Sequence, residues 1–209
     1  MVRENIAAVK ELLSGIGFDS GLEQALRAKA CYLPVLFQID YTLNRSGDTC
    51  VFVFHIKNTD GIYQCLYYDA CYKKEVVVND DAASSLETRM QLVDWHAVPA
   101  PETFDEIESV ITDMQTLAAA DALHANLLAY KYWAGTLLES KIGGLASLKA
   151  QYEISQRFYV TEGSKPISMD EAFRFLQSQW LAKQARRRAT PPAPAKARKP
   201  SRKAKHQEK

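Results

Sequence analysis

The chain has 209 residues with 26 Lys/Arg and 25 Asp/Glu, so its formal charge is close to neutral. That total hides two opposed blocks: residues 183–209 carry eleven Lys/Arg against one acid, and the rest carries fifteen Lys/Arg against twenty-four acids. No stretch of the sequence is apolar over 18 residues, and the N-terminus is too charged for a signal peptide. We therefore expect a cytoplasmic protein without membrane contact.

The first 75 residues predict two helices followed by three strands. An apolar stripe over 6–16 predicts the first helix, and a capping box at 20–23 starts the second. Alternation of apolar residues, with tight turns between the segments, predicts strands over 33–41, 50–57 and 62–72. We expect a three-stranded antiparallel meander on which the N-terminal helices pack.

Residues 75–121 carry eleven acids and a single base, Arg89. A capping box at 103–106 starts a predicted helix in this stretch, and residues 90–95 predict either a short strand or an anchored loop. The outer face of the helix holds Asp105, Glu106, Glu108 and Asp113. Acids in a first turn suit the helix dipole, but the dipole does not explain why bases are so rare here. This acidic surface is therefore a candidate site for a basic protein partner.

The remaining segments predict mainly helices. A short extended piece over 157–160 interrupts them, and a capping box at 168–171 starts a last helix whose apolar stripe should pack against the body. The fold prediction is α+β: N-terminal helices on a three-stranded antiparallel meander, followed by a C-terminal helical bundle. Residues 1–184 are expected to form one domain.

Residues 185–209 consist mostly of Lys, Arg, Ala and Pro and contain no large apolar side chain. Such a segment cannot bury enough surface to offset its chain entropy, so we expect a disordered basic tail after a helical start at 186–188. Charge asymmetry of this kind is typical of a tethered electrostatic contact, most often with DNA or RNA and sometimes with an acidic protein surface. The candidate nucleic-acid-binding residues are Arg186, Arg187, Arg188, Lys196, Arg198, Lys199, Arg202, Lys203 and Lys205.

The sequence shows no arrangement of nucleophile, base and orienting group. The four histidines are isolated, Asp80 and Asp81 lack a third ligand nearby, and the four cysteines lack zinc-site spacing. We therefore expect free thiols and no catalytic residue, metal or cofactor. An enzyme with an unrecognised site is kept as an alternative.

The third predicted strand is rich in tyrosine, at positions 63, 67, 68 and 72. Exposed aromatic side chains on a sheet can stack on bases, as in RNA-recognition sheets. The neighbouring strand lacks the basic and glycine residues of that fingerprint. The favoured interpretation is therefore that these tyrosines pack under the flanking helices.

Four stretches carry a family resemblance: LLSGIGFDSGLEQAL, LYYDACYKKEV, YKYWAGTLLE and QYEISQRFYVTEGSKPISMDEAFRFLQSQWLAKQ. They resemble a protein family, without an assigned activity, that is carried on conjugative transposons and other mobile elements of Bacteroidetes. The likeness covers most of residues 5–185, and FYVTEGSKPISMDEAFRFL is its most specific part. The resemblance implies a role in a mobile element and favours nucleic-acid contact. It supplies no catalytic residue or cofactor.

Together these observations predict a non-enzymatic accessory protein of a mobile element that contacts nucleic acid without sequence preference through its basic tail. The alternative from another class is a protein-interaction module that uses the acidic surface over 75–121.

Overall fold

The computed structural model describes residues 2–17, 21–32, 34–160 and 165–189. Its elements follow one another in the order α1 (Val2–Gly15), α2 (Gly21–Ala30), β1 (Leu36–Arg45), β2 (Asp48–Thr59), β3 (Ile62–Lys73), α3 (Asp81–Gln91), η1 (Pro101–Thr103), α4 (Phe104–Ala120), α5 (Ala122–Trp133), η2 (Leu137–Lys141), α6 (Leu145–Tyr152), β4 (Glu153–Tyr159) and α7 (Met169–Ala189). The predicted α+β class is confirmed. Within the described residues, none of the helices combines the length and the apolar character that crossing a membrane requires.

Two tight hairpins connect β1 to β2 and β2 to β3, as the turn residues predicted. Ser46 and Gly47 have φ values of 50° and 84°, and Asp60 and Gly61 have values of 54° and 85°. Two successive residues with positive φ make the type I′ turn, whose twist matches that of the flanking strands. Gly47 has a φ of 84°, which residues with a Cβ adopt only with strain, and a Cβ here would also displace the Glu75 carboxylate, so the turn favours glycine.

The sheet has four strands in the order β1-β2-β3-β4, all antiparallel, so the predicted meander of three strands was incomplete. β4 pairs along β3, with Tyr159 opposite Tyr67 and Glu153 opposite Lys73. The extended piece predicted over 157–160 overlaps the last three residues of this strand, 157–159. The pairing was missed because the chain between β3 and β4 contains four helices, and local periodicity carries no information about such distant partners.

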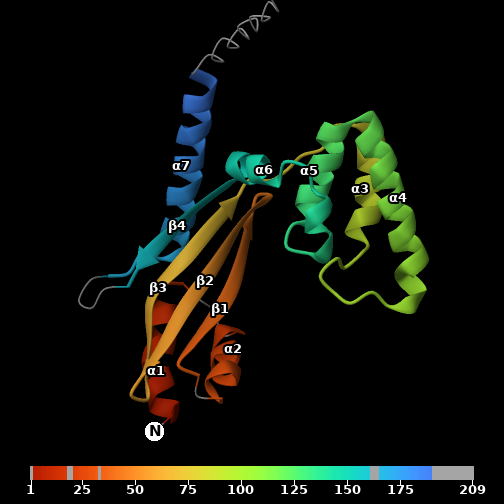
Figure 1. Ribbon diagram of the computed structural model, residues 1–209. Helices are drawn as coiled ribbons and strands as arrows, with labels where there is room; N and C mark the ends of the chain where they lie inside the picture. Colours follow the sequence, from red (N-terminus) through yellow and green to blue (C-terminus); the bar gives the residue numbers. More distant parts are fainter. Residues whose placement is uncertain (1, 18–20, 33, 161–164, 190–209) are drawn as a thin grey trace, which may run out of the picture.

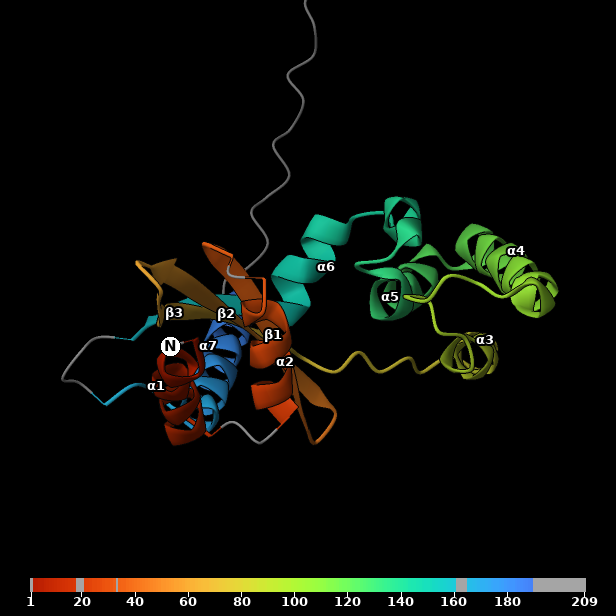
Figure 2. The same ribbon diagram turned by 90° about the horizontal axis from the view of Figure 1, so that it is seen from below.

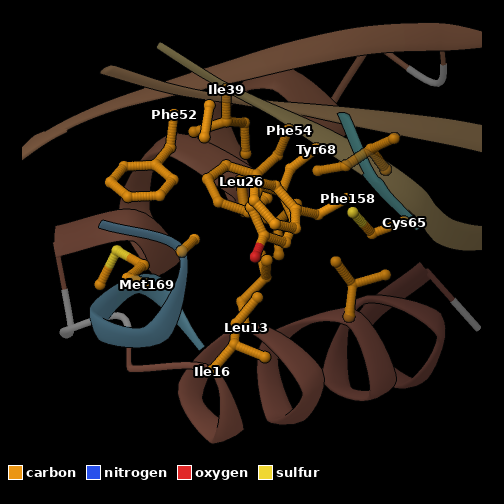
Figure 3. Packing of buried hydrophobic residues seen from close by; sticks show 14 of the residues in the cluster. Leu13, Ile16, Leu26, Ile39, Phe52, Phe54, Cys65, Tyr68, Phe158 and Met169 are labelled. Carbon is orange, nitrogen blue, oxygen red and sulfur yellow. The ribbon is translucent and has the colours of Figure 1, made fainter. Parts of the chain in front are cut away.

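Helices α1, α2 and α7 lie together on one side of the sheet (Figures 1 and 2). Buried side chains from these helices and from the four strands form one core, which we call the sheet cluster. Phe52, Phe54 and Tyr68 of the sheet meet Leu13 of α1 and Met169 of α7 there (Figure 3). The last helix therefore packs against the body, as predicted, but it belongs to the sheet and not to the C-terminal bundle.

Helices α3, α4, α5 and α6 form a second core together with Val76 and Val78, which we call the helical cluster. It comprises residues 76–152 and stands beside the sheet in Figure 1. The membership of the predicted bundle therefore differs from the prediction, because α3 belongs to it and α7 does not. Residues 92–95 form a loop, which a 2.8 Å hydrogen bond from Trp95 Nε1 to the carbonyl of Met90 anchors. Of the two predictions for residues 90–95, a short strand or an anchored loop, the loop is the one found.

One of the predicted capping boxes is present and another is absent. The Ser168 backbone N–H donates to the Glu171 carboxylate over 2.8 Å, and Ser168 Oγ accepts from the Glu171 N–H over 3.3 Å. The box predicted at Thr103 does not form, because Thr103 ends the preceding 3-10 turn and its hydroxyl donates to the carbonyl of Ala100 instead. The box at Ser20 lies outside the described residues.

Candidate functional site

The C-terminal end of α7 carries the described part of the predicted nucleic-acid site. Arg186, Arg187 and Arg188 are exposed in its last turn, which contains the predicted helical start of the basic segment. The other six predicted contacts lie outside the described residues: Lys196, Arg198, Lys199, Arg202, Lys203 and Lys205. The structure therefore shows where the first residues of the basic segment lie on the protein.

Side chains near the end of α7 bind the backbone where α6 meets β4. Trp180 Nε1 and Gln184 Nε2 donate to the carbonyl of Gln151 over 3.0 and 2.9 Å. Arg187 donates to the carbonyl of Ala150 over 3.0 Å. These carbonyls lie in the last turn of α6, where the helix dipole favours cations. The contacts hold the start of the basic segment in a fixed place on the body.

The sheet face opposite α1, α2 and α7 presents polar and aromatic side chains from all four strands. Tyr159 of β4 is 70 % exposed, and Arg157 and Gln38 are exposed on the outer strands. His55 and Asp69, on the central strands, are half-buried between them. We call this surface the open face of the sheet.

A hydrogen-bond network crosses the open face. The Arg157 guanidinium donates to both oxygens of Asp69 over 2.8 and 2.9 Å, and His55 Nε2 lies 2.9 Å from the same carboxylate. Gln38 Nε2 lies 3.2 Å from His55 Nδ1, so the two ring nitrogens of His55 face Gln38 and Asp69. The Arg157 hydrogen bonds hold the pKa of Asp69 below its ordinary value against the opposing effect of partial burial, and His55 adds to the lowering.

Planar side chains of the open face cluster around Tyr67. The Arg157 guanidinium lies over the Tyr67 ring at 3.9 Å from its centroid, and the His55 ring centroid is 4.5 Å from that of Tyr67. Tyr159 follows at 6.0 Å. A guanidinium placed over a ring, next to an exposed tyrosine, offers two planar groups on which a nucleobase can stack.

The charges of the open face cancel. The strand registers place three acids and three bases on it: Asp40, Asp69, Glu153, Lys57, Lys73 and Arg157. By contrast, residues 76–152 of the helical cluster carry eleven acids and four bases. A phosphate backbone is therefore repelled much less by the open face than by the helical cluster.

Sequence reasoning missed this site because of a register shift. Tyr63, Tyr68 and Tyr72 are buried under the helices, as predicted, but Tyr67 points to the opposite face. A bulge next to His55 and Ile56 of β2 breaks the alternation of β3 at this point. The available signal was the tyrosine-rich third strand, for which a stacking surface was the less favoured alternative to packing under the helices.

Two of the four acids of the predicted acidic site form ion pairs with Arg89. Arg89 of α3 pairs with Glu106 at 2.9 Å and with Asp113, so these two carboxylates are engaged within the helical cluster. Asp105 and Glu108 are exposed, and no hydrogen bond or ion pair of their side chains is found among the described residues. Only part of the predicted acidic set is therefore free to meet a partner.

The remaining polar candidates have structural partners. Asp80 caps α3 by accepting from the Ala83 N–H over 2.9 Å, and His124 lies 2.7 Å from the capping residue Asp121. Buried Asp48 accepts hydrogen bonds from Tyr72, from Lys74 and from the Glu75 N–H. All four cysteines are free thiols, and in the part of the chain that the structure describes no three potential metal ligands come together. His206 lies outside that part.

Comparisons of the chain with protein-family models, with curated proteins and with solved structures returned no match.

Proposed function

We propose that this protein is a non-enzymatic nucleic-acid-binding protein that acts as an accessory protein of a mobile element. In this proposal the basic segment that begins at the end of α7 supplies the affinity. The observation that carries the proposal is the anchored run Arg186–Arg188, which leads directly into a segment with seven more Lys/Arg over 190–209. Cations on such an arm bind phosphates and release counterions without reading sequence.

The open face adds a preference for single strands in this proposal. Bases stack on aromatic and guanidinium planes only when they are unpaired, and Arg157 and Tyr159 offer such planes. Because the charges of the face cancel, its contribution depends on stacking and not on phosphate contacts.

The test measures binding of labelled single-stranded RNA, single-stranded DNA and duplex DNA by fluorescence anisotropy. If about five cations of the full chain engage phosphates, log K falls against log salt with a slope of about −4 to −5. Replacing Arg186, Arg187 and Arg188 by Gln should lower the magnitude of that slope by about 2–3. The control replaces three exposed bases elsewhere on the body, Lys141, Lys165 and Arg174, by Gln and makes the same change in net charge.

A second pair of variants tests the open face. Tyr159→Ala should weaken single-strand binding by about 1–3 kcal/mol and leave duplex binding unchanged. Tyr32→Ala removes a tyrosine that is 89 % exposed outside the open face and is the matched control. The proposal fails if the triple Arg→Gln variant and the control triple bind equally at about 150 mM salt. If Tyr159→Ala weakens single-strand and duplex binding equally, the open face does not provide the proposed preference for single strands.

A further inference from the structure

The helical cluster has an apolar groove on its surface. Its first part has a cavity volume of about 510 Å³ between the loop 93–99, α4 and the start of η2. A second hollow of about 340 Å³ follows between α4 and α5. Ile111 and Leu138 line both, so the two hollows adjoin. From Ile107 to Ala118 of α4 the groove is about 16 Å long, because an α-helix rises 1.5 Å per residue.

Large apolar side chains at the edge of this groove are exposed to solvent. Leu137 is 100 % exposed and Val98 is 92 % exposed, and both line the first hollow. Phe104 is 52 % exposed and precedes Ile107 and Ile111 by three and seven positions, so it continues their stripe along α4. A contiguous exposed apolar surface of this kind is typical of a protein-interaction site.

The helical cluster that carries the groove is negatively charged overall, although one acid and one base line the groove itself. Glu108 lies on α4 between Ile107 and Ile111 and carries no ion pair in the described part of the chain, and Asp94 lines the first hollow. Lys141 is the one base among the residues that line either hollow. The helical cluster as a whole has seven more acids than bases over 76–152. An occupant with an apolar face and basic flanks complements this surface.

We propose that the groove binds a short amphipathic helix of another protein, with aliphatic side chains facing α4 and Lys/Arg on its flanks. A helix laid in a groove uses apolar anchors at i, i+3 or i+4 and i+7, and a length of about 16 Å accommodates about eleven residues. The basic tail of this chain is not the occupant. Residues 190–209 contain no Val, Leu, Ile, Met or aromatic residue and include four prolines, which oppose a helix.

The test uses three synthetic peptides of about 16 residues, a length at which a helix begins to form in isolation. The first has Leu on one helical face and Lys on the other, the second has Glu in place of Lys, and the third is a scrambled Leu/Lys sequence. Trp95 and Trp133 lie at the groove, so their fluorescence reports occupancy in the full-length Trp180→Phe protein. We expect the Leu/Lys helix to bind and the other two peptides to bind at least about tenfold more weakly.

Groove variants decide whether that binding is located here. Leu137→Asp and Val98→Asp should each lower the affinity about tenfold, and neither should affect folding because both side chains are exposed. Glu108→Gln should lower it up to about fivefold, with the difference lost at high salt. Leu181→Asp, at a 57 % exposed leucine of α7, is the matched control and should change nothing.

Two outcomes overturn the proposal. One is binding of the Leu/Lys helix that Leu137→Asp leaves unchanged, or equal binding of the Leu/Glu helix. The other is concentration-dependent self-association, measured by analytical ultracentrifugation, that Leu137→Asp abolishes, because the occupant is then a second copy of this chain.

Discussion

The sheet cluster and the helical cluster differ in how their sequences are arranged. The helical cluster is one continuous segment, residues 76–152, placed between β3 and β4. The sheet cluster is assembled from both sides of that segment, because α1, α2 and β1–β3 precede it and β4 and α7 follow it. The sheet cluster therefore depends on distant contacts, whereas the helical cluster depends on local ones. We infer that the helical segment is an insertion that can unfold while the sheet stays folded.

The two clusters also carry different reporter residues. All four cysteines lie between residues 31 and 71, in the part of the chain that forms the sheet cluster. Two of the three tryptophans, Trp95 and Trp133, belong to the helical cluster. Burial raises the pKa of Cys50 to about 12 and that of Cys65 to about 11, so both thiols react slowly until the sheet opens. Thiol labelling and tryptophan fluorescence can therefore follow the two clusters separately.

The largest expected effects come from one core leucine in each cluster. Leu176 of α7 and Leu128 of α5 are both fully buried, so Leu176→Ala and Leu128→Ala should each cost about 2–5 kcal/mol. Leu176→Ala should shift the urea concentration at which Cys50 and Cys65 become labelled to a lower value. Leu128→Ala should shift the tryptophan-fluorescence transition of a Trp180→Phe protein to lower urea. If each variant shifts both signals equally, the two clusters unfold as the single domain over 1–184 that the sequence predicts.

The comparison also explains which parts of the fold could be predicted from the sequence. The hairpins β1–β2 and β2–β3 were predicted because Ser46–Gly47 and Asp60–Gly61 are local signals for type I′ turns. The apolar stripe of α7 was also predicted, because its spacing is a local signal in the sequence. The pairing of β4 with β3 could not be predicted, because paired residues such as Tyr159 and Tyr67 are separated in the sequence by the inserted helices. The separate core around α5 likewise depends on tertiary packing.

The open face illustrates the same limit at a candidate site. Arg157, Asp69 and His55 lie on three different strands, and no spacing in the sequence brings them together. The bulge in β3 then sends Tyr67 to their side of the sheet. The acidic surface could be predicted because the charge composition can be read from the sequence alone. The pairing of Glu106 and Asp113 with Arg89 could not be predicted, because it depends on how α3 packs against α4.

A smaller effect is expected at the point where the chain leaves the sheet for the inserted segment. Asp48 is 2 % exposed and accepts hydrogen bonds from Tyr72 at 2.6 Å, from Lys74 at 2.8 Å and from the Glu75 N–H at 3.1 Å. Asp48→Asn weakens these bonds and should cost about 2–3 kcal/mol, mainly in the thiol-labelling transition. Asp40→Asn, at an exposed position of the same sheet, is the matched control.

The pH dependence checks the cause of the Asp48 effect. Burial alone raises the pKa of Asp48, but the hydrogen bonds from Lys74, Tyr72 and Glu75 outweigh it and hold the pKa below the ordinary value of 3.8. A lowered pKa in the folded state means that this stabilisation is complete above 3.8 and is lost as the pH falls through the folded value. The stability difference between the parent and Asp48→Asn should therefore be constant near neutral pH and shrink only below 3.8. A difference that already shrinks near pH 6, about the range in which histidine titrates, contradicts this assignment.

The smallest effect concerns a hydrogen bond between the clusters. Tyr130 of α5 donates to a carboxylate oxygen of Glu153, the first residue of β4, over 2.7 Å. Tyr130→Phe should cost about 1–2 kcal/mol while both clusters are folded, since one hydrogen bond to a charged group is lost. Tyr132→Phe is the control, because the Tyr132 hydroxyl binds Glu87 within the helical cluster at 3.2 Å. In the Leu176→Ala background, at urea concentrations where Cys50 and Cys65 already label, Tyr130→Phe should no longer shift the fluorescence transition, whereas Tyr132→Phe still should. A Tyr130→Phe effect that persists after the sheet has opened would show that this hydroxyl stabilises α5 itself and does not link the two clusters.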